Sequence, residues 1–507
     1  MTKAAKDLSQ ENEALKKALR ARDQHIAVLE EKLRLALHKR FAASSEKVLP
    51  GQFNLFNEAE AISADAVAEE ATTTAPEHKR KKHGRKPLPD HIPRTRIEHD
   101  LPEQEKICAC GCRKTCIGEA VSEQLDIIPA KIQVLQHVRL KYACRSCEGV
   151  EDDAPAVMIA PLPPQPIPKS NASPGLLAHI VTAKFQDGLP LYRQETMFAR
   201  IGVKLPRATK ANWMIRGGDL IRPLINLMHE TQLGYDVLQM DETTVQVLKE
   251  KGRAATSKSY MWVTRGGPPS SPIILFTYDP SRSGAVPSRL LADFKGYLQT
   301  DGYEGYSAVA KREDIIHVGC LAHARRKFDE AVKAQTTNKT GLARQGFDMI
   351  QRIYRIEREA SMRNLGHAER KQLRDEKAKP LWDEMRQWLD RSLGQVPPGT
   401  LTGKALGYLN TQWTRLIRYL DDGRLEADNN LAENAIRPFV MGRKAWLFSD
   451  TPAGAEASAR LYSLIETAKA NGIEPYAYLR QVFTELPRAE SLADIEALLP
   501  YKSNFPR

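Results

Sequence analysis

The stretch from Tyr235 to Val247, YDVLQMDETTVQV, constrains the fold of this chain more than any other. β-branched and other apolar residues surround one acid, Asp241, and polar segments bound the stretch, which predicts a core strand. A carboxylate in such a strand costs several kcal/mol unless it is paired, protonated or bound to a cation. We therefore expect Asp241 to share a divalent metal with two acids far along the chain, Asp301 and Glu433.

Further apolar segments predict a mixed sheet around this strand. After the Asp241 strand, the pattern predicts two more strands, then helix, strand, helix and strand, which is the order of a ribonuclease-H-like sheet. In that fold the first strand carries one catalytic acid, the end of the fourth a second, and a later helix the third. The expected strands are 259–265, 271–279, 296–303 and 314–320, with helices at 287–294 and 304–311.

The third acid follows a long helical insertion, expected at about 325–425 and anchored by three tryptophans. On a helix from Asn429 to Arg437, Asn430 lies one turn before Glu433 and Arg437 one turn after it. Pro438 is expected to end that helix. A further helical pair near the C-terminus is expected to cover the sheet. The tryptophans are Trp382, Trp388 and Trp413.

The N-terminal segment carries a heptad pattern over residues 8–36, with Asn12 at one core position. This predicts a short coiled coil that forms a parallel dimer. The alternative is an amphipathic helix packed on its own protein. A flexible linker follows and ends in a basic cluster that contacts DNA phosphates or, alternatively, is a solvated charge run. The cluster comprises Lys79, Arg80, Lys81, Lys82, Arg85 and Lys86.

Six of the seven cysteines lie within residues 106–147, where short strands are expected over 119–142. Two cysteine knuckles beside a small sheet predict a structural zinc ribbon, against the alternative of free thiols. The first knuckle is irregular, so Cys108 competes for a place in it. Cys320 stands apart and is expected to be a buried thiol. The preferred zinc ligands are Cys110, Cys112, Cys144 and Cys147.

A Pro-rich hinge at 161–170 precedes a helical region over 174–232. Two of its helices, separated by a turn at Gly202, predict a helix-turn-helix, with the segment Arg207 to Trp213 entering a DNA groove through Arg207 and Lys210. A plain helical hairpin is the alternative.

Composition agrees with a DNA-binding protein of the cytoplasm. The 507 residues carry a net charge of +12, which favours a polyanionic partner, although simple solubility explains it as well. No apolar run is long enough to span a membrane, and residues 1–20 are charged throughout, which excludes a secretory signal. Clustered cysteines suit a reducing compartment.

Several strings make the chain resemble the insertion sequence 66 family of bacterial DDE transposases. The likeness runs from near residue 1 to about residue 485, although the first cysteine knuckle departs from the usual CxxC. The matching strings are GRKPLPDHIPRTRIEHDLP, KYACRSCEG, PGLLAHIVTAKFQDGLPLYRQE, MDETTVQV, LQTDGYEGY, GCLAHARRKF, DNNLAENAIRPFVMGRK and NGIEPYAYL.

The resemblance implies DNA transposition by a nucleoid-associated bacterial enzyme. Asp241, Asp301 and Glu433 would hold two Mg²⁺ (or Mn²⁺) ions, which activate first a water and then a 3′-hydroxyl and stabilise the leaving oxygen. Asn430 and Arg437 would act nearby. The N-terminal modules would pair two chains and bind the element's terminal inverted repeats, and small accessory proteins of the element are expected. His323, Arg325 and Arg326 are candidates for DNA-backbone contacts, and the alternative is that they form a charged helix surface.

We therefore expect a multidomain α+β protein. Two other functions stay open at this point: a catalytically inert DNA-binding regulator, and a ribonuclease-H-like nuclease that cuts without joining. The expected parts are a coiled coil (1–41), a linker with the basic cluster (42–90), a zinc ribbon (91–155), a helical DNA-binding region (156–233), the catalytic domain with its insertion (234–450) and a C-terminal helical region (451–507).

Overall fold

The structure is a computed structural model that describes residues 3–41, 132–143, 157–335 and 341–502. The chain divides into two units, one formed by residues 1–66 and 163–507 and the other by residues 67–162. Among the described residues, no helix is both long enough and apolar enough to cross a membrane.

In the described part of the smaller unit, the chain forms a short antiparallel ladder. Strand β1 (Lys141–Ala143) pairs with β2 (Val157–Ile159). The strands expected over 119–142 are wrong for residues 132–140, which form neither helix nor strand. The apolar side chains there are exposed, 92% in the case of Val134, so this alternation does not mark a buried strand face. Residues 119–131 lie outside the described part.

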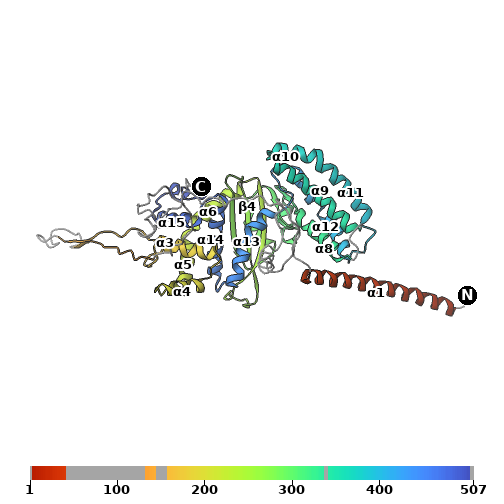
Figure 1. Ribbon diagram of the computed structural model, residues 1–507, viewed down its shortest axis with the longest axis horizontal. Coiled ribbons are helices and arrows are strands. Elements are labelled where there is room, and N and C mark those ends of the chain that lie inside the picture. The colour runs from red at the N-terminus through yellow and green to blue at the C-terminus, as the bar shows by residue number, and fades with distance from the viewer. Residues whose placement is uncertain (1–2, 42–131, 144–156, 336–340, 503–507) are drawn as a thin grey trace, which may run out of the picture. The chain divides into compact units, whose positions relative to one another are not determined.

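The N-terminal segment is one continuous helix, α1 (Lys3–Phe41) (Figure 1). Its heptad positions Leu15, Leu19, Leu29 and Leu33 are exposed. The described residues do not bury this apolar stripe, and a coiled-coil partner would cover it. Dimerisation stays a prediction.

The larger unit is built around a five-stranded mixed sheet with the order β5-β4-β3-β6-β7. The first three strands pair antiparallel, and β6 and β7 continue the sheet in parallel with β3. The strands lie where the sequence predicted them, although β6 is shorter than expected. Their bounds are β3 (Val237–Gln246), β4 (Lys258–Gly266), β5 (Ile273–Asp279), β6 (Gly296–Gln299) and β7 (Ile315–Val318).

Short helices connect the later strands. Helix α7 (Ala285–Leu290) leads to β6, and two 3₁₀ turns, η2 (Glu304–Ser307) and η3 (Val309–Lys311), lead to β7. Gly296 begins β6 with φ of +127°, and a Cβ there would lie 2.4 Å from the carbonyl oxygen of Asp236. Glycine therefore permits both the backbone turn and the close approach of β6 to β3.

Four helices lie between β2 and β3 in the sequence, and two of them occupy the place where the sequence predicted a helix-turn-helix or a plain helical hairpin. Between α4 and α5, Gly202 adopts a φ of +82°, which favours glycine at the turn. The four are α3 (Pro174–Phe185), α4 (Leu191–Arg200), α5 (Arg207–Leu220) and α6 (Arg222–Leu233).

A helical insertion follows β7 (Figure 1). It has its own apolar core. As the sequence predicted, Trp382 and Trp388 are buried there, and the ring of Trp413 packs edge-on against Trp382. The helices are α8 (Leu321–Ala334), α9 (Leu342–Met362), α10 (His367–Leu373), the π-helical turn η4 (Arg374–Ala378), α11 (Lys379–Ser392), α12 (Leu401–Ile417) and the 3₁₀ turn η5 (Arg418–Leu420).

Helix α13 (Asn430–Trp446) returns the chain to the sheet and packs on β3 and β4. The expectation that Pro438 ends this helix is wrong, because the helix passes through it. Its buried residues recur at helical spacing on both sides of the proline, so packing on the sheet outweighs the lost backbone hydrogen bond. These residues are Ala432, Ala435, Ile436, Phe439 and Gly442.

The C-terminal helices cover the sheet at its antiparallel edge. The hydroxyls of Ser463 and Thr467 on α14 accept hydrogen bonds from the backbone N–H groups of Phe276 and Ile274, at 2.7 and 3.0 Å. Edge strand β5 is therefore closed by side chains of a helix. The helices are α14 (Pro452–Ala470), α15 (Pro475–Glu485), the turn η6 (Leu486–Arg488) and α16 (Leu492–Glu496).

Candidate active site

Asp241 lies in the middle of β3, the central strand, opposite Val263 of β4. Its carboxylate accepts one hydrogen bond, of 2.8 Å, from the backbone N–H of Glu242. Burial raises the pKa of Asp241 well above its usual range, and the charges of Glu242, Glu433 and Asp301 raise it further. The expected acid is thus a largely buried carboxylate surrounded by other carboxylates.

Asp301 follows the end of β6, the strand that runs parallel beside β3. Its Oδ1 accepts a 2.9 Å hydrogen bond from the backbone N–H of Tyr303, and this turn directs the chain away from the sheet. Because β3 and β6 are neighbours, Asp301 and Asp241 lie near one another, and each contributes to the electrostatics of the site.

Glu433 lies in the first turn of α13. Burial raises its pKa to about 7, and the charges of Asp428 and Asp301 add to this effect. Arg326 and Arg437 act in the opposite direction. The structure therefore brings together all three acids that the sequence selected.

The segment before α13 is fastened to the ends of the strands. The side chain of Asn429 donates to the backbone carbonyl of Met240 at 2.9 Å, and its backbone N–H donates to Cys320 Sγ at 3.2 Å. The carbonyl of Ala427 accepts from the N–H of Leu321 at 3.0 Å. These bonds place the start of α13, and with it Glu433, beside Asp241.

The three acids fit a divalent cation. Glu433 Oε1 and Asn430 Oδ1 are buried, and among the described groups neither has a hydrogen-bond partner. Carboxylate and amide oxygens are the ligands of hard cations, and a bound cation removes the cost of keeping neighbouring carboxylates ionised. Asp241, Asp301 and Glu433 could hold such ions, with Asn430 beside them.

Glu242 is a fourth acid at this place that the sequence argument missed. Side chains alternate along a strand, so Glu242 points away from Asp241. Its side chain is 2% exposed and is held by Arg282 at 2.6 Å and by the hydroxyl of Tyr306 at 2.5 Å. Arg282 comes from the segment between β5 and α7, and Tyr306 from the 3₁₀ turn η2 after β6. Because its carboxylate oxygens already accept hydrogen bonds from these two side chains, Glu242 stabilises the structure around the site.

Cys320 and His323 also border the site. Cys320 is a buried free thiol, as expected, and His323 Nδ1 lies 3.8 Å from Glu433 Oε1. Burial lowers the pKa of His323 to about 4, with Arg326 adding to this effect. One ligand atom each from Cys320, His323 and Glu433 lies within 4.8 Å of the others, so this trio could also hold a metal ion.

The predicted DNA contacts in the described residues divide into two groups. Arg325 and Arg326 lie on α8 with His323, beside the acids, and Arg207 is exposed at the start of α5. The expectation for Lys210 is wrong: its side chain is fully buried, and its ammonium donates to the carbonyl of Leu205. Burial lowers the pKa of Lys210. Its apolar stem lies in the helical core, so it is no candidate for phosphate contact.

The other predicted sites lie outside the described residues. They are the basic cluster of Lys79, Arg80, Lys81, Lys82, Arg85 and Lys86, and the zinc ligands Cys110, Cys112, Cys144 and Cys147 with the competing Cys108.

The central strand of a mixed sheet, the turn after its parallel neighbour and a returning helix thus bring three acids together. Comparison with known families identifies the group. Residues 169–457 match the family described as "Transposase IS66 family", and the chain belongs to it. Residues 463–501 match the "IS66 C-terminal element".

The N-terminal parts match companion modules of the same family. Residues 28–97 match "Transposase C of IS166 homeodomain", and residues 105–148 match the "zinc-finger binding domain of transposase IS66". The matches indicate a transposase that has DNA as partner, uses divalent metal and carries a zinc-finger module.

Curated relatives come from Sinorhizobium fredii. The protein named "Uncharacterized protein y4qI" is 33% identical over 88% of this chain and 82% of its own length. "Uncharacterized protein y4jD" is 32% identical over 82% of this chain and 81% of its own length. A third, "Uncharacterized protein y4hP", is 29% identical over 94% of this chain and 84% of its own length.

Proposed function

We propose that this transposase binds the terminal inverted repeats of its insertion sequence and catalyses metal-dependent strand cleavage and strand transfer. The observation that carries the proposal is the meeting of Asp241, Asp301 and Glu433. They come from the central strand, the turn after its parallel neighbour, and the first turn of the returning helix. Burial and mutual charge raise the pKa of Asp241 and Glu433.

The sheet supports a ribonuclease-H-like catalytic domain. The first strand is central, the second and third extend it antiparallel on one side, and the fourth and fifth extend it in parallel on the other. The helical insertion lies between the second and third acids in the sequence, where the chain leaves the sheet after β7 and returns as α13.

The chain's own residues would prepare the reaction in distinct ways. When bound, Mg²⁺ or Mn²⁺ would supply Lewis-acid activation of a water or a 3′-hydroxyl and stabilise the leaving oxygen. Asp241, Asp301 and Glu433 would hold the ions. Asn430 and Arg437 would orient Glu433 or meet phosphate, and Arg325 and Arg326 would bind the DNA backbone beside the acids.

The remaining modules would deliver DNA to this site. The exposed heptad stripe of α1 would pair two chains, and the basic cluster at 79–86 would meet phosphates. A zinc ribbon held by four cysteines and the α4–α5 helix-turn-helix would contact the terminal repeats, with Arg207 on its exposed face. Accessory proteins of the element are a further expected partner.

Two other functions share parts of this structure. A DNA-binding regulator would use the N-terminal modules and leave the acids inert, and a nuclease would cut without joining. The burial of the acids favours an enzyme over a regulator. Buried carboxylates destabilise a fold, and in an inert protein no function would compensate for that loss of stability.

The test is cleavage and joining of a labelled DNA that carries the source element's end, with Mg²⁺ and with EDTA. The wild-type chain should cleave and join only with metal, and Asp241→Ala should bind the same DNA without cleaving it. Cleavage without joining would support the nuclease. Full activity of Asp241→Ala would refute the metal-site assignment. Wild-type chain that binds the DNA but does not cleave it, even when the element's accessory proteins are added, would support the regulator.

A further inference from the structure

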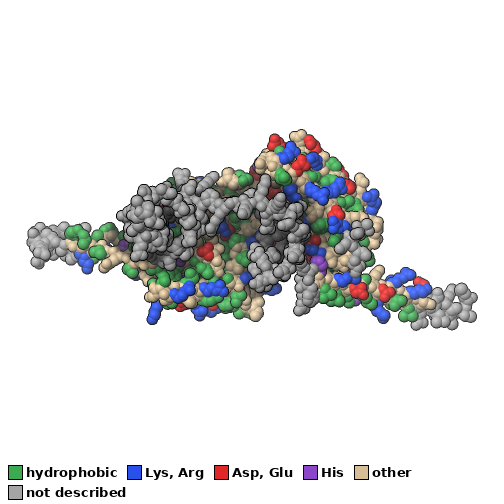
Figure 2. Space-filling view, viewed as in Figure 1, with side chains coloured by type: hydrophobic (Ala, Val, Ile, Leu, Met, Phe, Trp, Pro, Cys, Tyr) green, Lys and Arg blue, Asp and Glu red, His purple; other side chains and the backbone are tan. Residues whose placement is uncertain are grey.

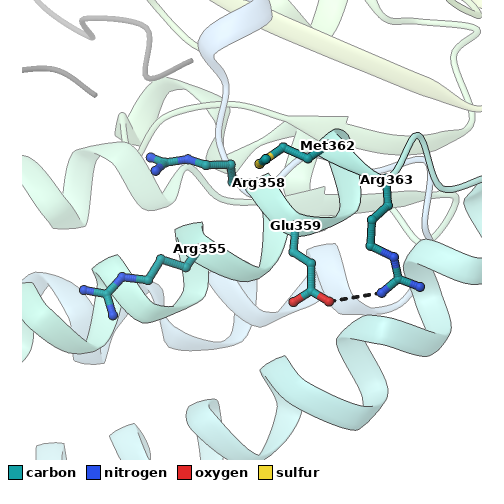
Figure 3. Close-up of a pocket in the computed structure, with 5 residues that line it drawn as sticks. All are labelled: Arg355, Arg358, Glu359, Met362 and Arg363. Carbon is teal, nitrogen blue, oxygen red and sulfur yellow. Dashed lines mark hydrogen bonds and ion pairs between the residues drawn. The ribbon is translucent and has the colours of Figure 1, made fainter. Parts of the chain in front are cut away.

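A shallow hollow of about 290 Å³ lies on the outer face of α9 in the helical insertion. Figure 3 shows its lining residues, which come from the second half of that helix and the residue after it: Arg355, Arg358, Glu359, Met362 and Arg363. Met362 is 77% exposed, which is unusual for so apolar a side chain. The hollow thus combines a cationic wall with one apolar contact point.

Two of the four arginines of α9, and Arg363 directly after the helix, already have an acidic partner. Arg344 pairs with Asp348 at 2.9 Å, Arg352 with Glu384 at 3.0 Å and Arg363 with Glu359 at 3.0 Å. Figure 2 shows such mixing of basic and acidic side chains over the helical insertion. A general excess of charge therefore does not distinguish this face.

Arg355 and Arg358 differ from these. Within the described part of the chain, no carboxylate lies within ion-pair distance of either side chain. The one acid in the hollow, Glu359, is itself held by Arg363 and by Lys377 at 2.7 Å. Two neighbouring guanidinium groups, three residues apart on one helix, therefore keep their charge available for an external anion.

The same helix reaches the candidate active site. The buried hydroxyl of Tyr354 donates to Asp428 Oδ2 at 3.0 Å, in the segment that leads into α13 and Glu433. Arg358 follows Tyr354 by four residues, so both lie on one side of α9. Closer to the acids, Arg325 of α8 stacks over Phe347 of α9 at 5.1 Å. Cationic side chains thus continue from the acids along α9.

We propose that this face of α9 binds the phosphates of DNA that extends from the active site, with Arg355 and Arg358 on the backbone and Met362 against a sugar or base. The proposal rests on the proposed function, which requires DNA to leave the site in both directions. A guanidinium group can donate two hydrogen bonds at once to the oxygens of one phosphate. A hollow with a single apolar side chain fits a phosphate backbone better than a protein surface, whose interface core is apolar.

Photo-crosslinking in the full chain tests the contact directly. The photoreactive residue p-benzoylphenylalanine would replace Met362, and in a control chain it would replace Leu492, which is exposed on α16. The probe is a labelled duplex that carries the source element's end and its flanking DNA. We expect a DNA crosslink from position 362 and none from position 492.

Two matched double variants test the arginines. Arg355→Gln with Arg358→Gln removes the available pair, and Arg344→Gln with Arg352→Gln removes two paired arginines from the same helix. The first should abolish the crosslink and reduce the slope of log affinity against log salt by about 2, since each phosphate contact contributes about 0.9. The second should leave both unchanged. Circular dichroism checks that each variant is folded.

The outcomes separate this inference from the proposed function. If the wild type binds and cleaves DNA but position 362 gives no crosslink, or the Arg355/Arg358 variant keeps crosslink and slope, the inference is overturned and the function stands. A crosslink from position 362 to a protein in place of DNA also overturns it. If the wild type does not bind the duplex at all, both fail.

Discussion

The side-chain amide of Asn429 donates a 2.9 Å hydrogen bond to the backbone carbonyl of Met240, the residue before Asp241. Both groups are buried. This bond ties the start of α13 to the central strand across 189 positions of sequence. The distance between the first and third acids therefore depends on this hydrogen bond.

Asn429→Leu should weaken both stability and cleavage. The substitution keeps the approximate size but leaves the carbonyl of Met240 buried without its donor, which costs roughly 1–3 kcal/mol. We expect a lower urea midpoint and a loss of strand cleavage at least tenfold larger than the loss of DNA affinity. The control is Asn434→Leu, an exposed position on the same helix. Equal cleavage by both variants would contradict the positioning role.

Neutralising an acid of the site should stabilise the metal-free protein. Asp241→Asn removes a charge from a place where burial and neighbouring carboxylates oppose ionisation. Without metal, the variant should melt a few degrees above the wild type, and it should lose all metal-dependent cleavage. Asp293→Asn, an exposed carboxylate, serves as the control and should change neither property. A lower melting temperature for Asp241→Asn would contradict the electrostatic account.

The effect of Mg²⁺ on stability should depend on pH. The pKa of Glu433 is raised to about 7 in the folded chain, so between its ordinary value and pH 7 the folded state binds more protons than the unfolded state. The metal-free protein therefore loses this contribution to stability as pH rises through that window. Because Mg²⁺ needs the ionised carboxylate, it should raise the melting temperature more at about pH 8 than at about pH 5.5.

Differential scanning fluorimetry with Mg²⁺ and with EDTA at both values checks this expectation. Glu433→Gln cannot titrate and should lose most of the pH dependence of the Mg²⁺ effect. A shift by Mg²⁺ that is equal at the two pH values in the wild type would refute the role of Glu433 as a ligand that exchanges a proton for metal.

Arg282→Met should destabilise the fold around the site without removing a metal ligand. Arg282 holds Glu242 at 2.6 Å and stacks 3.8 Å from the ring centre of Tyr303. Without it, a nearly buried carboxylate loses its countercharge, which costs about 3 kcal/mol. Arg289→Met breaks the more exposed pair with Asp279 and should cost about 1 kcal/mol or less. Urea denaturation compares the two variants, and equal losses would contradict the structural role of Glu242.

The sequence could predict the sheet because its strands are short apolar runs with clear boundaries. It could select Asp241 because an acid interrupts such a run, and Asp301 because it ends another. The role of Glu242 could not be predicted, because its partners Arg282 and Tyr306 come from the connection after β5 and the 3₁₀ turn η2, and no local sequence pattern reveals the positions of these segments. The continuation of α13 past Pro438 could not be predicted either. A proline inside a helical pattern predicts that the helix ends there, but the packing of α13 on the sheet stabilises the helix beyond it.

Lys210 shows the same limit at a predicted DNA contact. A lysine on a helix of a basic protein is expected to lie at the surface, but Lys210 is buried. Its ammonium group donates a hydrogen bond to the carbonyl of Leu205 and lies 5.9 Å from the ring centre of Phe198. Arg207, three residues earlier on the same helix, is exposed, and only the fold around α5 distinguishes the two residues.

The two residues should therefore respond in opposite ways. Lys210→Met keeps the apolar stem but removes the donor to Leu205, so stability should fall by about 1 kcal/mol while affinity for terminal-repeat DNA at fixed salt stays the same. Arg207→Gln should leave stability unchanged and, if α5 contacts phosphate, lower the salt slope by about 0.9. Fluorescence anisotropy over a salt series, with urea denaturation on the same samples, measures both effects. A loss of DNA affinity in folded Lys210→Met would show that this lysine reaches DNA after all, and that α5 rearranges when it binds.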